Sequence, residues 1–273
     1  VSFTGSSQTG SLVGEICGRL HKRVCLEMGD KNAQIVMEDA DLELALDGAV
    51  WGAFGTAGQR CTATSRLILH RDIKAKFKEM LKERASKLRL GAGYDTNTEI
   101  GPIINDKQLQ QVRIYMDIAR SEGASILIGG GIANEGTLKE GYFFQPTILD
   151  NVTPNMRVAR EEIFGPVVAL IEVNSFEQAI DILNDTNYGL SSSIYTRDVN
   201  RAFAAMRDIE AGITYINGPT IGAEVHLPFG GVKQTGNGHR EAGNAAIDTF
   251  TEWKTVYVDF SGSLQRAQID NRD

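Results

Sequence analysis

The stretch Val167–Ile216 decides the fold that this sequence predicts. It reads VVALIEV at Val167–Val173, FEQAIDIL at Phe176–Leu183, SSIY at Ser192–Tyr195, VNRAFAAMR at Val199–Arg207 and ITYI at Ile213–Ile216. Three short runs rich in β-branched residues alternate here with two segments whose apolar residues recur every three to four positions. Such alternation predicts βαβ units and therefore a parallel sheet.

The same rhythm extends over most of the chain. Further strands are predicted at Val1–Phe3, Val24–Leu26, Arg66–His70 and Ser125–Ile128, and further helices at Asp39–Phe54, Ile73–Leu88 and Asp106–Glu122. The predicted fold class is α/β, a parallel sheet with flanking helices. Open sheets of this kind hold their sites beyond the carboxyl ends of the strands, so we expect the site there.

The glycine run Gly129–Gly131 has two interpretations. It predicts a surface turn, because no capped helix follows it at the spacing of a dinucleotide-binding fingerprint. Phosphate binding at this run is the alternative.

Composition narrows the function classes. The 273 residues are 42% hydrophobic, which is enough for one large domain or two ordinary ones. A formal charge of −7 argues against nucleic-acid or anionic-membrane surfaces, and no apolar run approaches the roughly 20 residues that span a bilayer. The three cysteines form neither a CxxC pair nor an even disulfide set, which predicts free thiols in a cytoplasmic protein. A small-molecule substrate and no metal site are expected.

Two residues are candidates for catalytic chemistry. Cys61 follows a Gly-Gln-Arg turn, and the neighbouring Arg60 predicts a setting that favours thiolate. The alternative is an inert buried cysteine. Glu27 ends an apolar strand and precedes Met28-Gly29, so its carboxyl is expected to be partly desolvated with a raised pKa, as a general base requires. The alternative for Glu27 is an ordinary salt-bridge acid.

Five blocks of sequence resemble one family. LEMGDKN at Leu26–Asn32 resembles the glutamate signature of the aldehyde dehydrogenase superfamily, and FGTAGQRCT at Phe54–Thr62 resembles its cysteine signature. EEIFGPV at Glu161–Val167 is similar to the motif that binds the cofactor ribose. The late substrate-side blocks are matched by Asn217, Pro228–Lys233 and Gly236. The blocks follow the family's order and spacing and cover nearly the whole chain.

The resemblance implies NAD(P)-dependent oxidation of an aldehyde to a carboxylic acid. The Cys61 thiolate would attack the aldehyde carbon, and the thiohemiacetal would lose hydride to nicotinamide and leave a thioester on sulfur. Glu27 would activate the water that hydrolyses this thioester. The backbone N–H of Cys61 would be one oxyanion donor.

The resemblance also implies binding residues. Gly5 and Ser6, at the start of a helix, would face the cofactor pyrophosphate. Glu162 would bind the nicotinamide ribose and Phe164 would pack near it, while the choice between NAD and NADP stays open. On the substrate side, Gly222 and Ala223 lie in a loop that resembles the carboxylate-holding loop of amino-acid semialdehyde dehydrogenases, and Phe229 follows it. An ordinary glycine turn is the alternative reading of that loop.

Two residues depart from the family pattern. Asp30 stands where the family usually has glycine, so its charge is expected to displace the nicotinamide end or to repel Glu27. Gln234 stands where a small residue is common, and it is expected to crowd a turn beside the pocket.

The absent first half of the family's sequence is a larger departure. Family members are considerably longer, and their first half supplies most of the dinucleotide-binding sheet, a second oxyanion donor and an adenine-ribose lysine. We therefore expect a truncated chain that has impaired activity and binds NAD weakly. The alternatives are a catalytically silent structural or interaction module and a residual esterase that needs no NAD.

These considerations predict three segments. Residues 1–30 would be the remnant of a Rossmann-like dinucleotide-binding domain, residues 31–227 the catalytic domain, and residues 228–273 a return segment with an oligomerisation tail. Thr255–Phe260 alternates apolar and polar or small residues like an edge strand. In the family this position adds to a sheet of the neighbouring subunit, so a homo-oligomer is expected; a strand that folds back on its own domain is the alternative.

Overall fold

A seven-stranded sheet forms the centre of the fold, in the order β5-β6-β7-β4-β3-β8-β9. The computed structural model describes residues 1–264. The strands are β3 (Ala33–Val36), β4 (Arg66–His70), β5 (Ser125–Ile128), β6 (Thr147–Asp150), β7 (Val167–Val173), β8 (Ser191–Tyr195) and β9 (Ile213–Ile216). Every residue of β3, β4 and β8 is buried, as expected for parallel strands that are covered on both faces. The predicted α/β class is confirmed.

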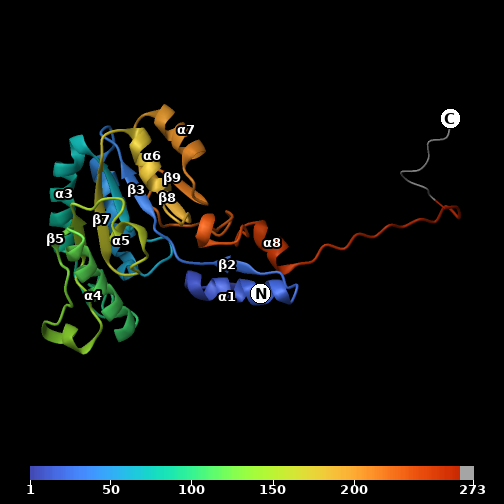
Figure 1. The fold of residues 1–273 in the computed structure, drawn as a ribbon, viewed down its shortest axis with the longest axis horizontal. Coiled ribbons are helices and arrows are strands. Elements are labelled where there is room, and N and C mark those ends of the chain that lie inside the picture. Colours follow the sequence, from blue (N-terminus) through green and yellow to red (C-terminus); the bar gives the residue numbers. More distant parts are fainter. Residues whose placement is uncertain (265–273) are drawn as a thin grey trace.

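Six helices accompany this sheet (Figure 1). They are α2 (Leu42–Phe54), α3 (Arg71–Ser86), α4 (Asp106–Ser121), α5 (Arg157–Arg160), α6 (Phe176–Asn184) and α7 (Val199–Asp208). Side chains at Asp41, Asn105 and Ser175 accept hydrogen bonds from amides three residues onward, which caps α2, α4 and α6. α2 packs on α3, and α6 packs on both α7 and the central strands.

Two expectations about the sheet need correction. β5 is antiparallel to β6, whereas a fully parallel sheet was expected. The chain between them reverses through a turn at Gly129–Gly130, both with positive φ, and a short 3-10 segment, η2 (Gly136–Glu140), without a crossover helix. The glycine run is thus a turn between two strands, as predicted. The four-residue strands β3 and β6 were not predicted.

The first 27 residues form a separate small sheet. β1 (Ser2–Thr4) and β2 (Cys25–Glu27) pair in parallel and are connected by α1 (Ser7–Arg19). Figure 1 shows this unit beside α8 (Ala245–Phe250) and to one side of the main sheet. Leu12, Ile16 and Leu20 lie 55%, 39% and 61% exposed on or just after α1. The proposed domain limits at residues 30 and 227 stay predictions.

The C-terminal segment leaves the body of the molecule. Thr255–Phe260 is exposed and has no strand partner within residues 1–264, so the alternative of a strand that folds back on its own domain is not found (Figure 1). Pairing with a second chain stays a prediction, and residues 265–273 of the expected tail lie outside the described part. Within residues 1–264, none of the helices has the length and apolar character required to cross a membrane.

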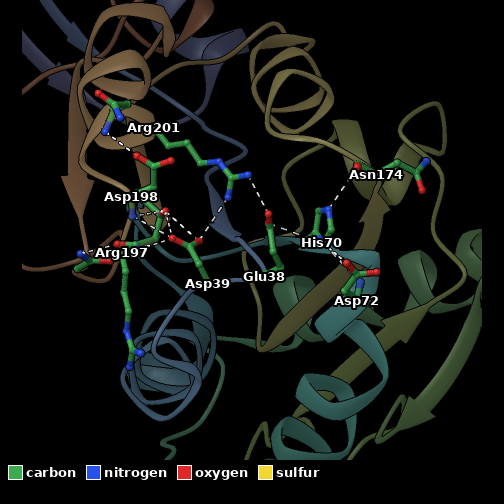
Figure 2. Close-up of polar contacts among 11 residues, drawn as sticks. Glu38, Asp39, His70, Asp72, Asn174, Arg197, Asp198 and Arg201 are labelled. Atoms are coloured by element: carbon green, nitrogen blue, oxygen red, sulfur yellow. Dashed lines mark hydrogen bonds and ion pairs between the residues drawn. The ribbon is translucent and has the colours of Figure 1, made fainter.

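An ion-pair network occupies the carboxyl edge of the sheet. Asp39, just after β3, accepts hydrogen bonds from the Thr196 hydroxyl (2.8 Å) and from the backbone N–H groups of Arg197 (2.8 Å) and Asp198 (2.9 Å). Arg201 of α7 donates to Glu38 at 2.8 Å, and Figure 2 shows how these side chains join the end of β3 to the start of α7. The polar groups at this edge are therefore paired with one another.

Candidate active site

The predicted catalytic residues lie at the amino edge of the main sheet. Ala33 of β3 pairs with Arg66 of β4 and with Ser192 of β8, so three neighbouring strands begin at one edge. Glu27 precedes β3 and Cys61 precedes β4 at this edge. The expectation of a site beyond the carboxyl ends is therefore wrong for the main sheet, whereas Gly5, Ser6 and Glu27 do lie at the carboxyl ends of β1 (Ser2–Thr4) and β2 (Cys25–Glu27). The segments that lead into β3 and β4 therefore carry the two predicted catalytic residues.

A strained turn places Cys61. α2 is followed by η1 (Gly55–Gly58), in which Thr56 and Ala57 have φ of 58° and 55°, values that non-glycine residues rarely adopt. Gly58 has φ of +64°, and a Cβ there would lie 2.1 Å from the carbonyl oxygen of Gly165. Position 58 thus requires glycine, because any side chain there would be strained by the positive φ and would clash with the Gly165 carbonyl. The close approach of Gly58 to the Gly165 carbonyl holds the Cys61 turn against the segment that contains Glu162 and Phe164.

Asn32 connects the Cys61 turn to the sheet. Its side-chain Nδ2 donates to the carbonyls of Cys61 (2.7 Å) and Ala63 (2.9 Å), and its Oδ1 accepts from the Ser191 N–H (2.9 Å). Its own carbonyl accepts from the Arg66 N–H at the start of β4. Asn32 is 3% exposed, so these bonds form away from water and fix the turn relative to three strands.

The segment after β9 returns to the same edge. The Ser191 hydroxyl donates to the carbonyl of Thr220, and the Thr220 hydroxyl donates to the carbonyl of Thr62 at 2.7 Å. Thr220 Oγ1 also lies 2.8 Å from Thr64 Oγ1. Hydrogen bonds therefore hold the residues that follow Cys61 in the sequence, as the Gly58 contact holds those that precede it.

A glutamine from α4 holds the predicted ribose-binding segment. Gln108 Nε2 donates to the carbonyls of Ile163 (2.9 Å) and Phe164 (3.0 Å). Phe164 has φ of 55° and is 37% exposed. Its backbone is thus held in a sparsely populated conformation by a side chain from a different element.

One cavity of about 390 Å³ joins the predicted catalytic and cofactor residues. Its walls are Thr4, Gly5, Ser6, Met28, Gly29, Cys61, Gln108, Gln111, Glu162, Ile163 and Phe164. The predicted nucleophile Cys61 and all four predicted cofactor residues therefore line the same space, although they come from segments far apart in the sequence. Glu27 lies next to this cavity without forming part of its wall.

Two features of this cavity fit the pyrophosphate and the nicotinamide ribose of a dinucleotide. Ser6 is the N-cap of α1, so the free amides of a 13-residue helix face a wall of the cavity and can bind phosphate. Gly29 provides a close backbone approach, because a Cβ there would lie 2.6 Å from Glu162 Oε2. Glu162 Oε1 accepts from the Asp30 N–H at 3.2 Å, which orients the carboxylate that would bind ribose hydroxyls.

The thiol of Cys61 is held protonated. Burial raises its pKa to about 11, and the negative charges of Glu27, Asp30 and Glu162 add to that effect, while the backbone N–H of Cys61 itself opposes it. The expectation that Arg60 favours thiolate is therefore wrong: Arg60 is exposed and is not among the groups that shift this pKa. Cys61 needs a proton acceptor to act as a nucleophile.

Glu27 has the environment that was predicted for it. It is 4% exposed, and neither carboxylate oxygen has a hydrogen-bond partner among the described residues. Burial raises its pKa to about 8, Glu241 raises it further and Arg240 lowers it. The carboxyl packs near Gly230, where a Cβ would lie 2.7 Å from Glu27 Oε1. A carboxyl of this kind accepts a proton readily once ionised.

The two departures from the family pattern have different consequences. Asp30 is buried, its Oδ1 accepts from the Leu190 N–H at 3.1 Å, and its charge acts on the Cys61 thiol. Asp30 is not among the groups that shift the pKa of Glu27, so the expected repulsion of Glu27 is not found. Gln234 is exposed on η3 (Lys233–Thr235), so the expectation that it crowds the pocket is wrong.

The predicted substrate residues lie outside the cavity wall. Gly222 and Ala223 are on an exposed loop, and Gly222 has φ of +114°. Phe229 pairs through its backbone with Glu241, whose charge reaches Glu27. The structure thus places Phe229 in a segment that acts on Glu27 through Glu241, and the substrate role of all three residues stays a prediction.

Three supporting residues were not predicted from the sequence. The sequence assigns no role to Asn32 beyond its place in the block Leu26–Asn32, places Gln108 in a predicted helix, and carries no local signal for Thr235. The Thr235 hydroxyl lies 3.0 Å from the Gly29 carbonyl and accepts from the Gly189 N–H. Among these three residues only Asn32 has a sequence signal, because it lies in the block Leu26–Asn32 that resembles the glutamate signature.

Comparison with known proteins identifies the family. The sequence profile of the Aldehyde dehydrogenase family matches residues 1–256. The chain belongs to the aldehyde dehydrogenase family. It is 45% identical over 258 residues to an alpha-ketoglutaric semialdehyde dehydrogenase of Bacillus subtilis, which covers 94% of this chain and 53% of that protein. A betaine aldehyde dehydrogenase of Brucella anthropi is 40% identical over 259 residues, 95% of this chain and 53% of that protein.

Solved aldehyde dehydrogenase structures have the same fold. The betaine aldehyde dehydrogenase of Staphylococcus aureus in complex with NAD⁺ superposes with a TM-score of 0.89 at 38% identity, over 91% of this chain and 49% of that chain. This aldehyde dehydrogenase chain therefore spans about half the length of the relatives it matches.

All three cysteines are free, and no cluster of three or more potential metal ligands occurs within residues 1–264.

The first prediction concerns the stability of the Glu27→Gln variant as a function of pH. The folded pKa of Glu27 is raised from 4.5 to about 8, so the folded state binds the proton more tightly than the unfolded state. That contribution to stability is complete below pH 4.5 and is lost as the pH rises through about 8. Relative to wild type, Glu27→Gln should therefore gain stability between pH 5 and pH 9, by up to about 5 kcal/mol.

Urea denaturation at pH 5, 7 and 9 measures this difference. Glu135→Gln, on an exposed stretch, serves as the control and should show a constant difference from wild type. A Glu27→Gln difference that stays equal at the three pH values would contradict the buried, unpaired carboxyl.

Proposed function

We propose that this chain carries the catalytic part of an NAD-dependent aldehyde dehydrogenase, with Cys61 as nucleophile and Glu27 as general base. The reaction is the oxidation of an aldehyde to a carboxylic acid. The observation that carries the proposal is the single cavity that Cys61 shares with Gly5, Ser6, Glu162 and Phe164. A relative that is crystallised with NAD⁺ supports the choice of cofactor, and NADP remains the second candidate.

Different residues of the chain carry out nucleophilic attack, cofactor positioning and proton removal. The Cys61 sulfur attacks the aldehyde carbon while its turn is held by Asn32 and Gly58. NAD, when bound, supplies the hydride acceptor. Ser6 and Glu162 both line the cavity and would position the cofactor there. Glu27 then takes a proton from the water that attacks the thioester, and its raised pKa of about 8 makes it a stronger base than an exposed glutamate.

Two other functions were considered for this chain. A silent structural module is not favoured, because both Cys61 and Glu27 are present and hydrogen bonds from Asn32 and Thr220 support the turn that carries Cys61. Ester hydrolysis without NAD requires only the nucleophile and the base. It is therefore the activity that the chain is expected to retain if NAD binds weakly to a segment half the length of its relatives.

We propose an aldehyde that carries a carboxylate as the substrate class. The support is the likeness to the alpha-ketoglutaric semialdehyde dehydrogenase of Bacillus subtilis and the glycine-containing loop at Gly222-Ala223. Backbone amides of such a loop can hold a carboxylate. We also keep a cytoplasmic location as a prediction from the three free cysteines.

The second prediction tests the nucleophile through hydrolysis of p-nitrophenyl acetate. Cys61→Ala should lower the hydrolysis rate to that of buffer, because no other described thiol lines the cavity. Cys17→Ala, a buried cysteine of α1, is the matched control and should retain the wild-type rate. Hydrolysis that persists undiminished in Cys61→Ala would place the nucleophile elsewhere.

We propose a homo-oligomer that forms through the C-terminal segment. Val256, Tyr257, Val258 and Phe260 are between 65% and 96% exposed, and β9 is an edge strand of the main sheet with one side unpaired among residues 1–264. An exposed apolar segment and an open sheet edge are complementary if Thr255–Phe260 of one subunit adds to β9 of another.

The third prediction is that deletion of Thr255–Asp273 converts the oligomer to monomers, because the deletion removes the added strand. Multi-angle light scattering measures the mass before and after deletion. A Tyr257→Lys variant keeps the full chain length and, like the deletion, should weaken association. An unchanged oligomer after deletion would eliminate strand addition.

A further inference from the structure

An exposed apolar stripe runs along α7, next to the outer edge of the main sheet. Val199, Phe203 and Met206 are 62%, 65% and 51% exposed. They lie four and three residues apart, a spacing that places all three on one side of a helix. Apolar residues that gather on one exposed side of an element mark an interaction site, whereas isolated ones need no explanation. None of the three residues takes part in the chemistry proposed above.

The contacts of α7 show which way this stripe faces. Arg201 donates to Glu38 at 2.8 Å, and Glu38 follows β3, so the Arg201 side of the helix faces the inner strands (Figure 2). At about 100° per residue, the three residues of the stripe lie about 140° to 160° around the helix from Arg201. Ala205, which is fully buried, lies between these two sides. The stripe therefore faces away from β3, toward the open edge of the sheet at β9.

The C-terminal segment of the chain carries a matching row of apolar side chains. Alternate residues of a strand share one face, so Val256, Val258 and Phe260 would lie on one face and Tyr257 and Asp259 on the other. The three residues of the first face are 65%, 70% and 96% exposed. That face would be about 13 Å long and the α7 stripe is about 10 Å long, so the two rows match in length and in number of residues.

We propose that the α7 stripe is the docking surface for Val256, Val258 and Phe260 of a second copy of this chain. The inference rests on the addition of Thr255–Phe260 to β9 proposed above, and it assigns the face of the added strand that is buried and the surface that buries it. An added strand lies about 4.8 Å beyond β9, below the outer side of α7. Its apolar face packs on the stripe, and Tyr257 points to the opposite face of the sheet.

A second copy is the occupant that the structure favours. The stripe and the C-terminal segment are both exposed in the single chain, and Figure 1 shows the segment leading away from the main sheet. Each copy therefore carries one apolar surface to offer and one to accept. In a twofold dimer the same contact forms twice, which closes the assembly and covers both surfaces of both copies.

The fourth prediction is that Phe203→Glu weakens self-association at least about tenfold in Kd, because it places a charge at the centre of an apolar contact. Analytical ultracentrifugation measures this Kd. Asn200→Glu is the matched control, since it places the same charge on an exposed position of α7 outside the stripe and should keep the wild-type Kd. Both positions are exposed, and melting curves establish that both variants are folded. Equal Kd values in the two variants would contradict the proposal.

Disulfide cross-linking tests which face of the segment contacts α7. Chains with Phe203→Cys are co-expressed with chains that carry Val258→Cys, and oxidation should give a covalent dimer, because each position is the middle of its row and the two meet in either strand direction. Tyr257→Cys in place of Val258→Cys is the control, and its yield should be at least about fivefold lower, since alternation turns it to the other face. All chains carry Cys61→Ala, which removes the native thiol that is not buried.

The outcomes separate this inference from strand addition itself. If deletion of Thr255–Asp273 gives monomers but Phe203→Glu behaves like its control, the role of the stripe is overturned and strand addition stands. An equal or higher cross-link yield at Tyr257 than at Val258 also overturns it, because the other face of the segment would then contact α7. An oligomer unchanged by the deletion, or a cross-link that forms only within a single chain carrying both cysteines, overturns both proposals.

Discussion

The side chain of Asn32 is the interaction on which the rest of the site depends. With three hydrogen bonds it connects the carbonyls of Cys61 and Ala63 to the amide of Ser191, while its own carbonyl receives the amide that starts β4. Arg66 reinforces the same connection, because its Nε donates to the carbonyl of Lys31 at 3.0 Å. Because the Asn32 side chain bonds both to the Cys61 turn and to β8, the position of Cys61 is set by the register of β3, β4 and β8.

The site is assembled from groups that destabilise the folded chain. Glu27, Asp30 and Glu162 all have raised pKa values because burial disfavours their charges, and the ammonium of Lys31 has a pKa lowered to about 7 for the same reason. Left-handed backbone at Thr56, Ala57 and Phe164 adds strain. Such costs persist only where surrounding packing enforces them, and they are typical of catalytic centres.

The sequence predicts much of this arrangement and misses identifiable parts. Short runs rich in β-branched residues predicted the limits of β4, β7 and β9 correctly, and two short signature blocks pointed to Cys61 and Glu27. Periodicity carries no information on which edge of a sheet a loop approaches, so the amino-edge site was missed. The thiolate prediction failed because Arg60 is exposed, while burial and the charges of three carboxylates raise the pKa of the Cys61 thiol. Gln108 and Thr235 act through tertiary contacts that leave no local pattern.

The central claim, that Asn32 holds the nucleophile in place, is tested most directly by the rate of Cys61-dependent ester hydrolysis in Asn32→Leu. Gln34→Leu is the matched control, since Gln34 is an equally buried amide two residues along the same segment that donates to Ala45 of α2 instead. The account predicts at least a tenfold lower rate in Asn32→Leu, because a displaced nucleophile loses its alignment, and a near wild-type rate in folded Gln34→Leu. Equal rates in the two variants would contradict it.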